Sequence, residues 1–368
     1  MKKLMVIPLV AAGMAAMVGC SKTPVKEAAK NDAINLANLD TAVAPGTDFY
    51  QYACGGWMKN NPLKPEYARF GTFDQLRDNN QEQIRTLIEG LSETPGQEGS
   101  VGQKIGMLFA MGMDSVKLNE DGYAPIKDQL AEINKLGTKD ELTKMVATLH
   151  KEGMAPFFAL YVGADEKNSS MNIVQLYQAG LGMGDRDYYL LEDESSQKMR
   201  EAYKNYITRL FTLIGSSPEQ ADAAVNAIMK IERGIAEVSF SREDLRDSQK
   251  NYNKMSIEDF KAKNDLLNWD VYFESMGMMD IKYLDAKQLS FYEGLSALMK
   301  NTTLDEQKYY LTFNLLSSAA PYLSDPFVAA DFDFYGKTMS GRQEQQPRWK
   351  RACLLYTSPS PRDRSVSR

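Results

Sequence analysis

Histidine is nearly absent from this chain, and cysteine is scarce. His150 is the only histidine among the 368 residues, and there are three cysteines, Cys20, Cys54 and Cys353. Zinc hydrolase sites generally use two or three histidines, so a single imidazole is a strong constraint on that chemistry. Three cysteines are also too few for a disulfide scaffold.

An excess of positive charge is missing as well. Lysine and arginine total 43 against 49 aspartates and glutamates, which gives a net charge of -6. An acidic chain without a basic stripe lacks the electrostatic signature of a nucleic-acid-binding protein, so no nucleic-acid partner is expected. Apolar residues make up 43% and charged residues 25%, which is typical of a folded globular protein.

The amino-terminal residues have the pattern of an export signal. Two lysines precede an uncharged apolar run at residues 4–18, which is shorter than the ~20 residues that a membrane-spanning helix needs. Small residues and then Cys20 follow, which resembles a bacterial lipobox with a lipidated cysteine. We expect residues 1–20 to be a lipoprotein signal peptide and 21–40 a polar tether, with Cys20 anchored in a membrane of the cell envelope. An ordinary signal peptide with an incidental cysteine is the alternative.

The folded part, expected over residues 41–352, is predicted to be mainly α-helical. Capping-box sequences, in which a Ser or Thr and a residue three positions later satisfy each other's backbone N–H groups, begin at Thr138, Ser217 and Thr303. Two runs rich in β-branched and aromatic residues, 157–162 and 173–177, are separated by a polar stretch. This pattern predicts a small β-hairpin near 157–178.

Three regions of the sequence carry a resemblance to a known family. They are Asp48–Trp57 with Arg69–Arg77, then Gly184–Leu190, and finally Arg348–Arg351. Together they resemble the amino-terminal region of the neprilysin and endothelin-converting-enzyme family of zinc metallopeptidases. They occur in the family's order, and the resemblance covers about residues 40 to 352.

This resemblance implies an exported peptidase that cleaves oligopeptides on the amino side of hydrophobic residues. In the family, two histidines of an H-E-x-x-H helix and a downstream glutamate bind zinc, and the helix glutamate acts as the general base. The present sequence, with one histidine, cannot contain that motif. We therefore expect an amino-terminal fragment that has no metal ligands or catalytic residues and is inactive by itself. The alternative is a non-catalytic lipoprotein that binds peptides or partners with the same helical scaffold.

One residue is assigned a direct role by the resemblance. Arg69 matches an arginine that binds the substrate carboxylate, and a guanidinium can hold a carboxylate through two parallel hydrogen bonds. An interdomain salt bridge is the other interpretation of Arg69.

Two further features are interpreted as structural. His150 is expected at a helix carboxyl end, facing solvent or bonded to a carbonyl, and the glycine-rich run 180–184 is expected to be a tight turn, because it lacks the Lys-Ser/Thr of a phosphate-binding loop.

The composition changes after Ala352. Apolar periodicity stops, and a Ser/Pro/Arg-rich run occupies residues 353–368, a composition that is ordinarily disordered. Its first six residues, Cys-Leu-Leu-Tyr-Thr-Ser, also resemble the translation of a transposon-type sequencing adapter. We expect residues 353–368 to be a non-native tail, with a natural basic tail as the alternative.

Overall fold

The computed structural model describes residues 35–357, with side chains through Leu354. The predicted signal peptide and Cys20 lie outside these residues, as does most of the predicted tail. The chain divides into two compact units, Met1–Pro62 and Leu63–Arg368. Within the described range, no helix combines the length and the apolar character needed to cross a membrane.

The described part of the first unit is a short 3-10 turn, η1 (Leu36–Asn38), followed by helix α1 (Phe49–Asn60). α1 begins where the Asp48 carboxylate accepts a hydrogen bond from the Gln51 N–H at 2.9 Å, as expected for an N-cap residue. Gly56 lets η1 approach this helix, because a Cβ there would lie 2.4 Å from the Ala37 carbonyl oxygen.

The second unit is built mainly of helices, as predicted. Each of the three predicted capping boxes forms at the start of a helix, which confirms those helix starts. The helices are α2 (Thr72–Glu93), α3 (Val101–Met113), α4 (Ser115–Asp121), α5 (Lys127–Lys135), α6 (Lys139–Lys151), α7 (Asp187–Leu190), α8 (Glu194–Leu213), α9 (Pro218–Val238), α10 (Ile257–Lys263), α11 (Trp269–Met276), α12 (Leu289–Lys300), α13 (Leu304–Ala319), α14 (Asp325–Asp331), the π-helical segment η5 (Phe332–Met339) and α15 (Arg348–Thr357).

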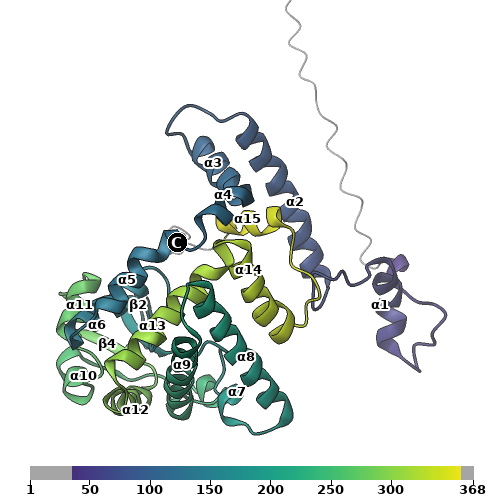
Figure 1. The fold of residues 1–368 in the computed structure, drawn as a ribbon. Helices are drawn as coiled ribbons and strands as arrows, with labels where there is room; N and C mark the ends of the chain where they lie inside the picture. The colour runs from purple at the N-terminus through teal and green to yellow at the C-terminus, as the bar shows by residue number, and fades with distance from the viewer. Residues whose placement is uncertain (1–34, 358–368) are drawn as a thin grey trace, which may run out of the picture. The chain divides into compact units, whose positions relative to one another are not determined.

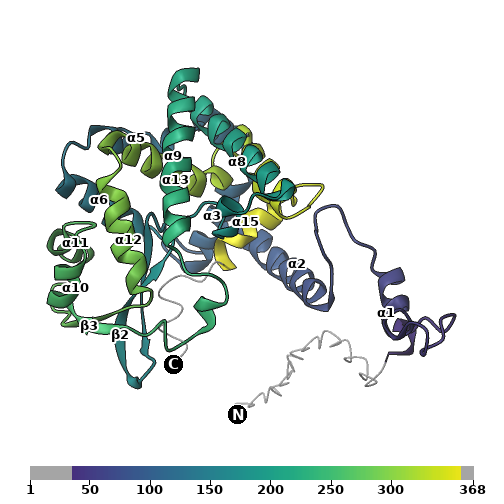
Figure 2. The ribbon, with the colours of Figure 1, turned by 90° about the horizontal axis from the view of Figure 1, so that it is seen from below.

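A small sheet of four strands lies against these helices. The predicted hairpin is confirmed as β1 (Phe158–Asp165) and β2 (Asn168–Gln178), which pair antiparallel. Two short strands that the sequence did not predict, β3 (Lys254–Ser256) and β4 (Tyr283–Ala286), complete the order β1-β2-β4-β3. β4 runs parallel to β2 and antiparallel to β3. α10 packs against β3 and β4, and Figure 2 shows it next to β3.

Two large apolar cores and one small core hold the second unit together. The first surrounds the sheet and contains Phe158, Trp269 and Tyr292. The second lies among α8, α9, α13 and α14, of which α8, α9 and α13 run side by side in Figure 1. The small core joins α2, α3 and α15 through Ile88, Phe109 and Cys353, and the Cys353 side chain is 1% exposed.

The predicted boundary after Ala352 falls inside α15 rather than at the end of a helix. Ala352 and Cys353 are both buried in the small core, so the described structure continues across this position. Residues 358–368 lie outside the described range, and the origin of the tail stays a prediction.

Candidate functional site

Arg69, the residue expected to contact substrate, lies in residues 63–71, the segment that leads into α2 and is called the connector below. Its side chain is exposed, and its guanidinium forms no hydrogen bond or ion pair with any residue that the structure describes. The N–H donors of Arg69 are therefore open to a ligand within this part of the chain.

A charged cluster fixes the connector immediately before Arg69. Lys350, on α15, places its Nζ 2.6 Å from Glu66 Oε1, 3.1 Å from Asp78 Oδ1 and 3.1 Å from the Tyr67 hydroxyl. The Tyr67 hydroxyl donates a further short hydrogen bond to Asp78. Lys350 and Tyr67 are each only 6% exposed. The connector is thus attached to α2 and α15 two residues away from Arg69.

The same cluster is held in its ionised form. Burial acts to raise the pKa of Asp78, but hydrogen bonds from Tyr67 and Lys350 outweigh it and leave this pKa below its usual value. Burial acts to lower the pKa of Lys350, and its hydrogen bonds to Glu66, Tyr67 and Asp78 raise it above the ordinary lysine value. A charged group in such surroundings is tolerated only because it is paired.

A second structured region is the turn at residues 178–184, which links β2 to α7. Its Gly184 N–H donates to the Leu181 carbonyl at 2.9 Å, which confirms the predicted tight turn. Glycine is required twice for steric reasons. A Cβ at Gly180 would lie 2.7 Å from the Tyr310 hydroxyl, and one at Gly182 would lie 1.8 Å from the Tyr203 hydroxyl.

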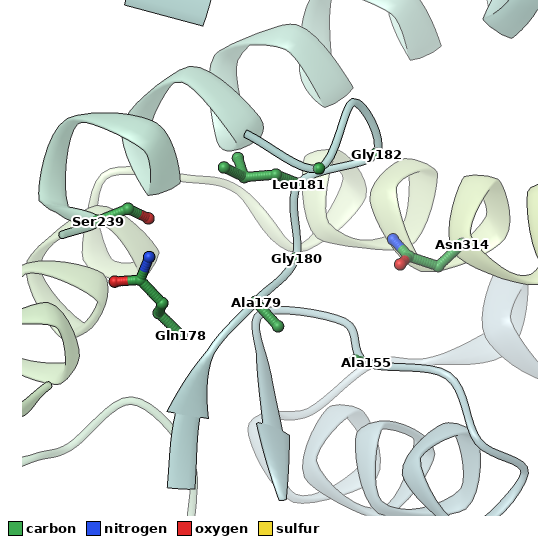
Figure 3. A pocket seen from close by; sticks show the side chains of 9 residues that line it. Ala155, Gln178, Ala179, Gly180, Leu181, Gly182, Ser239 and Asn314 are labelled. Carbon is green, nitrogen blue, oxygen red and sulfur yellow. The ribbon is translucent and has the colours of Figure 1, made fainter. Parts of the chain in front are cut away.

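This turn lines a cavity of about 390 Å³. In Figure 3 the turn passes between Gln178 and Ser239 on one side and Asn314 on the other. The Gln178 amide is already paired with the backbone of Phe240, accepting from its N–H at 2.7 Å and donating to its carbonyl at 3.3 Å. None of the lining residues is ionisable, so the cavity walls offer no group for acid–base chemistry. The lining residues are Ala155, Gln178, Ala179, Gly180, Leu181, Gly182, Gly184, Ser239 and Asn314.

A buried carboxyl group accepts a hydrogen bond from the backbone of this turn. Glu232, on α9, is 1% exposed. Its Oε2 accepts a hydrogen bond from the Tyr189 hydroxyl at 2.7 Å, and its Oε1 accepts from the Tyr203 hydroxyl at 3.0 Å and from the Gly182 N–H at 3.3 Å. Burial raises the pKa of Glu232 to about 7, although these hydrogen bonds act to lower it.

The sequence analysis missed Glu232, although a signal was present. The residue occupies the apolar stripe of α9, next to Ile231 and three positions before Ile235. A carboxylate at a core position of an amphipathic helix is unusual unless it is paired. The partner Tyr189 belongs to the segment 184–190 that carried the family resemblance.

His150 is engaged at both ring nitrogens. Nδ1 lies 2.6 Å from the Tyr272 hydroxyl and Nε2 lies 3.1 Å from the Pro156 carbonyl oxygen. Of the two expectations for His150, the carbonyl-bonded one is confirmed. Burial lowers the pKa of His150 to about 4. A neutral ring that donates from Nε2 and accepts at Nδ1 satisfies both contacts and leaves no nitrogen for a metal.

The described residues do not fit a zinc centre. No three His, Cys, Asp or Glu side chains among them are placed to hold a metal ion together, and the only imidazole of the whole sequence is the one bonded to Tyr272 and Pro156. We therefore assign no catalytic step to this chain's own residues.

Comparison with known proteins identifies the family. The model for the amino-terminal region of peptidase family M13 matches residues 45–359, and the chain belongs to this family. Endothelin-converting enzyme 1 of Mus musculus is 29% identical over 375 residues, which cover 95% of this chain and 48% of that protein. Neprilysin-11 of Caenorhabditis elegans is 27% identical over 350 residues, which cover 89% of this chain and 41% of that protein.

A solved structure agrees with these sequence relatives. The zinc metalloprotease ZMP1 of Mycobacterium tuberculosis, in complex with an inhibitor, superimposes with a TM-score of 0.81 at 27% identity, covering 88% of this chain and 49% of that chain. The expected resemblance to neprilysin-like peptidases and the mainly α-helical fold with a small hairpin are thus confirmed. The chain therefore spans about half, or less than half, of the length of each of these three relatives.

Proposed function

We propose that this chain is the amino-terminal part of an exported zinc metalloendopeptidase that acts on oligopeptides. We propose further that the chain lacks the zinc site and is inactive by itself. The observation that carries this proposal is the match to peptidase family M13 in a sequence with a single histidine, since zinc peptidases of the H-E-x-x-H type need two.

Exposed apolar side chains on two helices support the idea that more polypeptide belongs against this unit. Phe73 and Leu87 on α2 are 87% and 69% exposed, and Val101 and Met111 on α3 are 74% and 66% exposed. Side chains of this size on neighbouring elements commonly mark a surface that another part of a protein covers. The remaining half of a full-length family member is the occupant that this proposal implies.

A peptide-cleavage assay tests the proposal. The purified chain, with and without added zinc, is expected to leave a fluorogenic oligopeptide intact. A longer product of the same gene that contains an H-E-x-x-H segment is expected to cleave it in a zinc-dependent manner. Zinc-dependent turnover by the 368-residue chain at enzyme-like rates, about 1 s⁻¹ or more, would refute the assignment.

Within this function, Arg69 is proposed to bind the terminal carboxylate of a peptide substrate. The support is physical: its guanidinium has no partner among the described residues, and the cluster around Lys350 holds the backbone that presents it. In the longer, active protein, Arg69→Gln is expected to raise KM about tenfold or more for peptides with a free carboxyl terminus. Peptides with an amidated terminus are expected to change little.

Arg77→Gln is the matched control for a general loss of charge next to Arg69, because Arg77 is exposed on the neighbouring helix, pairs with Asp74 and lies 5.9 Å from the centre of the Tyr67 ring. Equal effects of Arg69→Gln on free and amidated peptides would contradict a carboxylate-binding role and favour the interdomain salt bridge.

Cys20 is proposed as a lipid anchor that places the protein at the periplasmic or extracellular face of the cell envelope. The support is the sequence pattern of the first twenty residues, which lie outside the described structure. Growth with a labelled fatty acid is expected to label the protein, and Cys20→Ser is expected to abolish the label. Labelling that persists in the Cys20→Ser variant would rule out this anchor.

A further inference from the structure

A cleft between α8 and α9 gathers positive charge in a molecule that is acidic overall. Its volume is about 380 Å³, and the buried Tyr189 is one of the residues that line it. Four basic side chains line it, and no acidic side chain does. The basic lining residues are Arg200, Lys204, Lys230 and Arg233, and the other lining residues are Tyr189, Val225, Asn226 and Met229.

Helix geometry explains why these four cations face one another. Arg200 and Lys204 are four positions apart on α8, and Lys230 and Arg233 are three apart on α9, so each pair occupies one helix face. The two helices are consecutive, joined by a short link, and packed against each other. The antiparallel arrangement brings the two pairs to opposite walls of the same cleft.

Each of the four cations pairs with a glutamate that is not itself among the residues lining the cleft. Lys204 pairs with Glu201 at 2.7 Å and Arg233 pairs with Glu237 at 3.4 Å, and these two glutamate side chains are 68% and 58% exposed. Ion pairs this exposed contribute little to stability and are screened by salt. Lys230 pairs with Glu306 at 2.7 Å, and Glu306 is likewise not one of the residues that line the cleft.

Arg200 differs from the other three because it is fixed. Its side chain is 12% exposed, and its Nη1 donates to the carbonyl oxygens of Tyr188 at 2.9 Å and Leu191 at 2.6 Å. Its Nη2 lies 3.1 Å from the exposed Glu192 carboxylate. The cleft therefore contains a guanidinium that loses little conformational freedom when an anion binds.

We propose that the α8–α9 cleft binds a small anion that carries two or more phosphate groups. Four cations on opposite walls match a ligand with several negative charges better than a single carboxylate, and both guanidinium and ammonium groups bind phosphate oxygens. A cleft of about 380 Å³ accommodates a molecule the size of pyrophosphate. The only aromatic ring in the lining, that of Tyr189, is 1% exposed, so the cleft lacks the stacking surface of a single-stranded nucleic-acid site.

Isothermal titration calorimetry of the full chain with pyrophosphate, at constant ionic strength, tests this proposal. We expect one saturable site whose affinity decreases as salt increases. The double variant Lys204→Gln/Arg233→Gln is expected to weaken binding about tenfold. Both residues pair only with exposed glutamates on their own helices, so the variant is expected to fold, which circular dichroism verifies.

Lys198→Gln is the matched control, because Lys198 is 75% exposed on α8 and is absent from the cleft lining. Its pyrophosphate affinity is expected to equal that of the unmodified chain. Three results would overturn the proposal: no saturable binding of pyrophosphate, equal affinities of the double variant and the control, or citrate binding as tightly as pyrophosphate.

The same variants distinguish two sources of the phosphate groups. Sedimentation with phosphatidylcholine vesicles, with and without a lipid that has a diphosphate headgroup (farnesyl diphosphate), reports whether the cleft binds diphosphate at a lipid surface. Farnesyl-diphosphate-dependent sedimentation that the double variant loses would identify a lipid headgroup as the source. Pyrophosphate binding without sedimentation would identify a free phosphate compound.

Discussion

Replacing Glu232 by glutamine removes a carboxyl group that titrates near neutral pH from the network beneath the 178–184 turn. The folded protein raises the pKa of Glu232 to about 7 because the group is buried, whereas an unfolded glutamate has a pKa of about 4.3. The folded state therefore binds this proton more tightly than the unfolded state does. The resulting stability is fully present below about pH 4 and is lost as the pH rises through about 7.

The magnitude follows from the separation of the two pKa values. Between about pH 4 and about pH 8, ionisation of Glu232 is expected to reduce the free energy of unfolding by roughly 2–4 kcal/mol. Glutamine does not ionise, and its amide oxygen can still accept a hydrogen bond from Tyr203 or the Gly182 N–H. The Glu232→Gln variant is thus expected to lose this part of the pH dependence.

Urea denaturation at several pH values between about 5 and 8 measures the difference. The quantity to compare is the pH slope of the unfolding free energy in the unmodified chain and in the variant, because other groups titrate equally in both. Glu237→Gln is the control, since Glu237 lies on the same helix with its side chain 58% exposed. Equal pH slopes for the unmodified chain and Glu232→Gln would refute the reasoning.

Two further substitutions test the packing around the candidate site. Lys350→Met removes the buried ammonium group that pairs with the partly buried carboxylates of Glu66 and Asp78, and is expected to destabilise the second unit by about 2–4 kcal/mol. Arg348→Gln breaks a more exposed pair with Asp325 and is expected to cost less than about 1 kcal/mol. Thermal denaturation compares the two, and equal losses would contradict the buried-pair argument. Gly182→Ala places a methyl group against the Tyr203 hydroxyl and is expected to cost about 2 kcal/mol or more. At Gly184 a Cβ meets open space and only the left-handed backbone opposes it, so Gly184→Ala is expected to cost about 1 kcal/mol; the reverse order in urea denaturation would show that the clash is relieved.

Local signals in the sequence were sufficient to predict many of the helices and the β1–β2 hairpin. The capping boxes at Thr138, Ser217 and Thr303 depend on residues three positions apart, and all three form. The β1–β2 hairpin is likewise closed by a short polar connection. β3 and β4 were missed because they have three and four residues and exist only through pairing with strands distant in the chain.

The site depends on contacts that no local pattern could reveal. Lys350 bonds to Glu66 across 284 positions of the sequence, and the resemblance that identified Arg69 contained no information about that contact. The sequence shows no basic stripe along the chain, yet the cleft between α8 and α9 gathers four cations because two helices pack together. Charge that is dispersed in sequence can therefore be concentrated in space.

The contact between Lys350 and Glu66 also constrains the order in which the protein can mature during synthesis. The connector carrying Arg69 leaves the ribosome long before α15 does, so during most of translation it lacks the ammonium group that neutralises Glu66 and Asp78. Its attachment to α15 forms only when the last described helix has been made and docked. Premature termination upstream of residue 350 would leave the segment before Arg69 attached to α2 through Lys64, Tyr67 and Asp78 but without its link to α15.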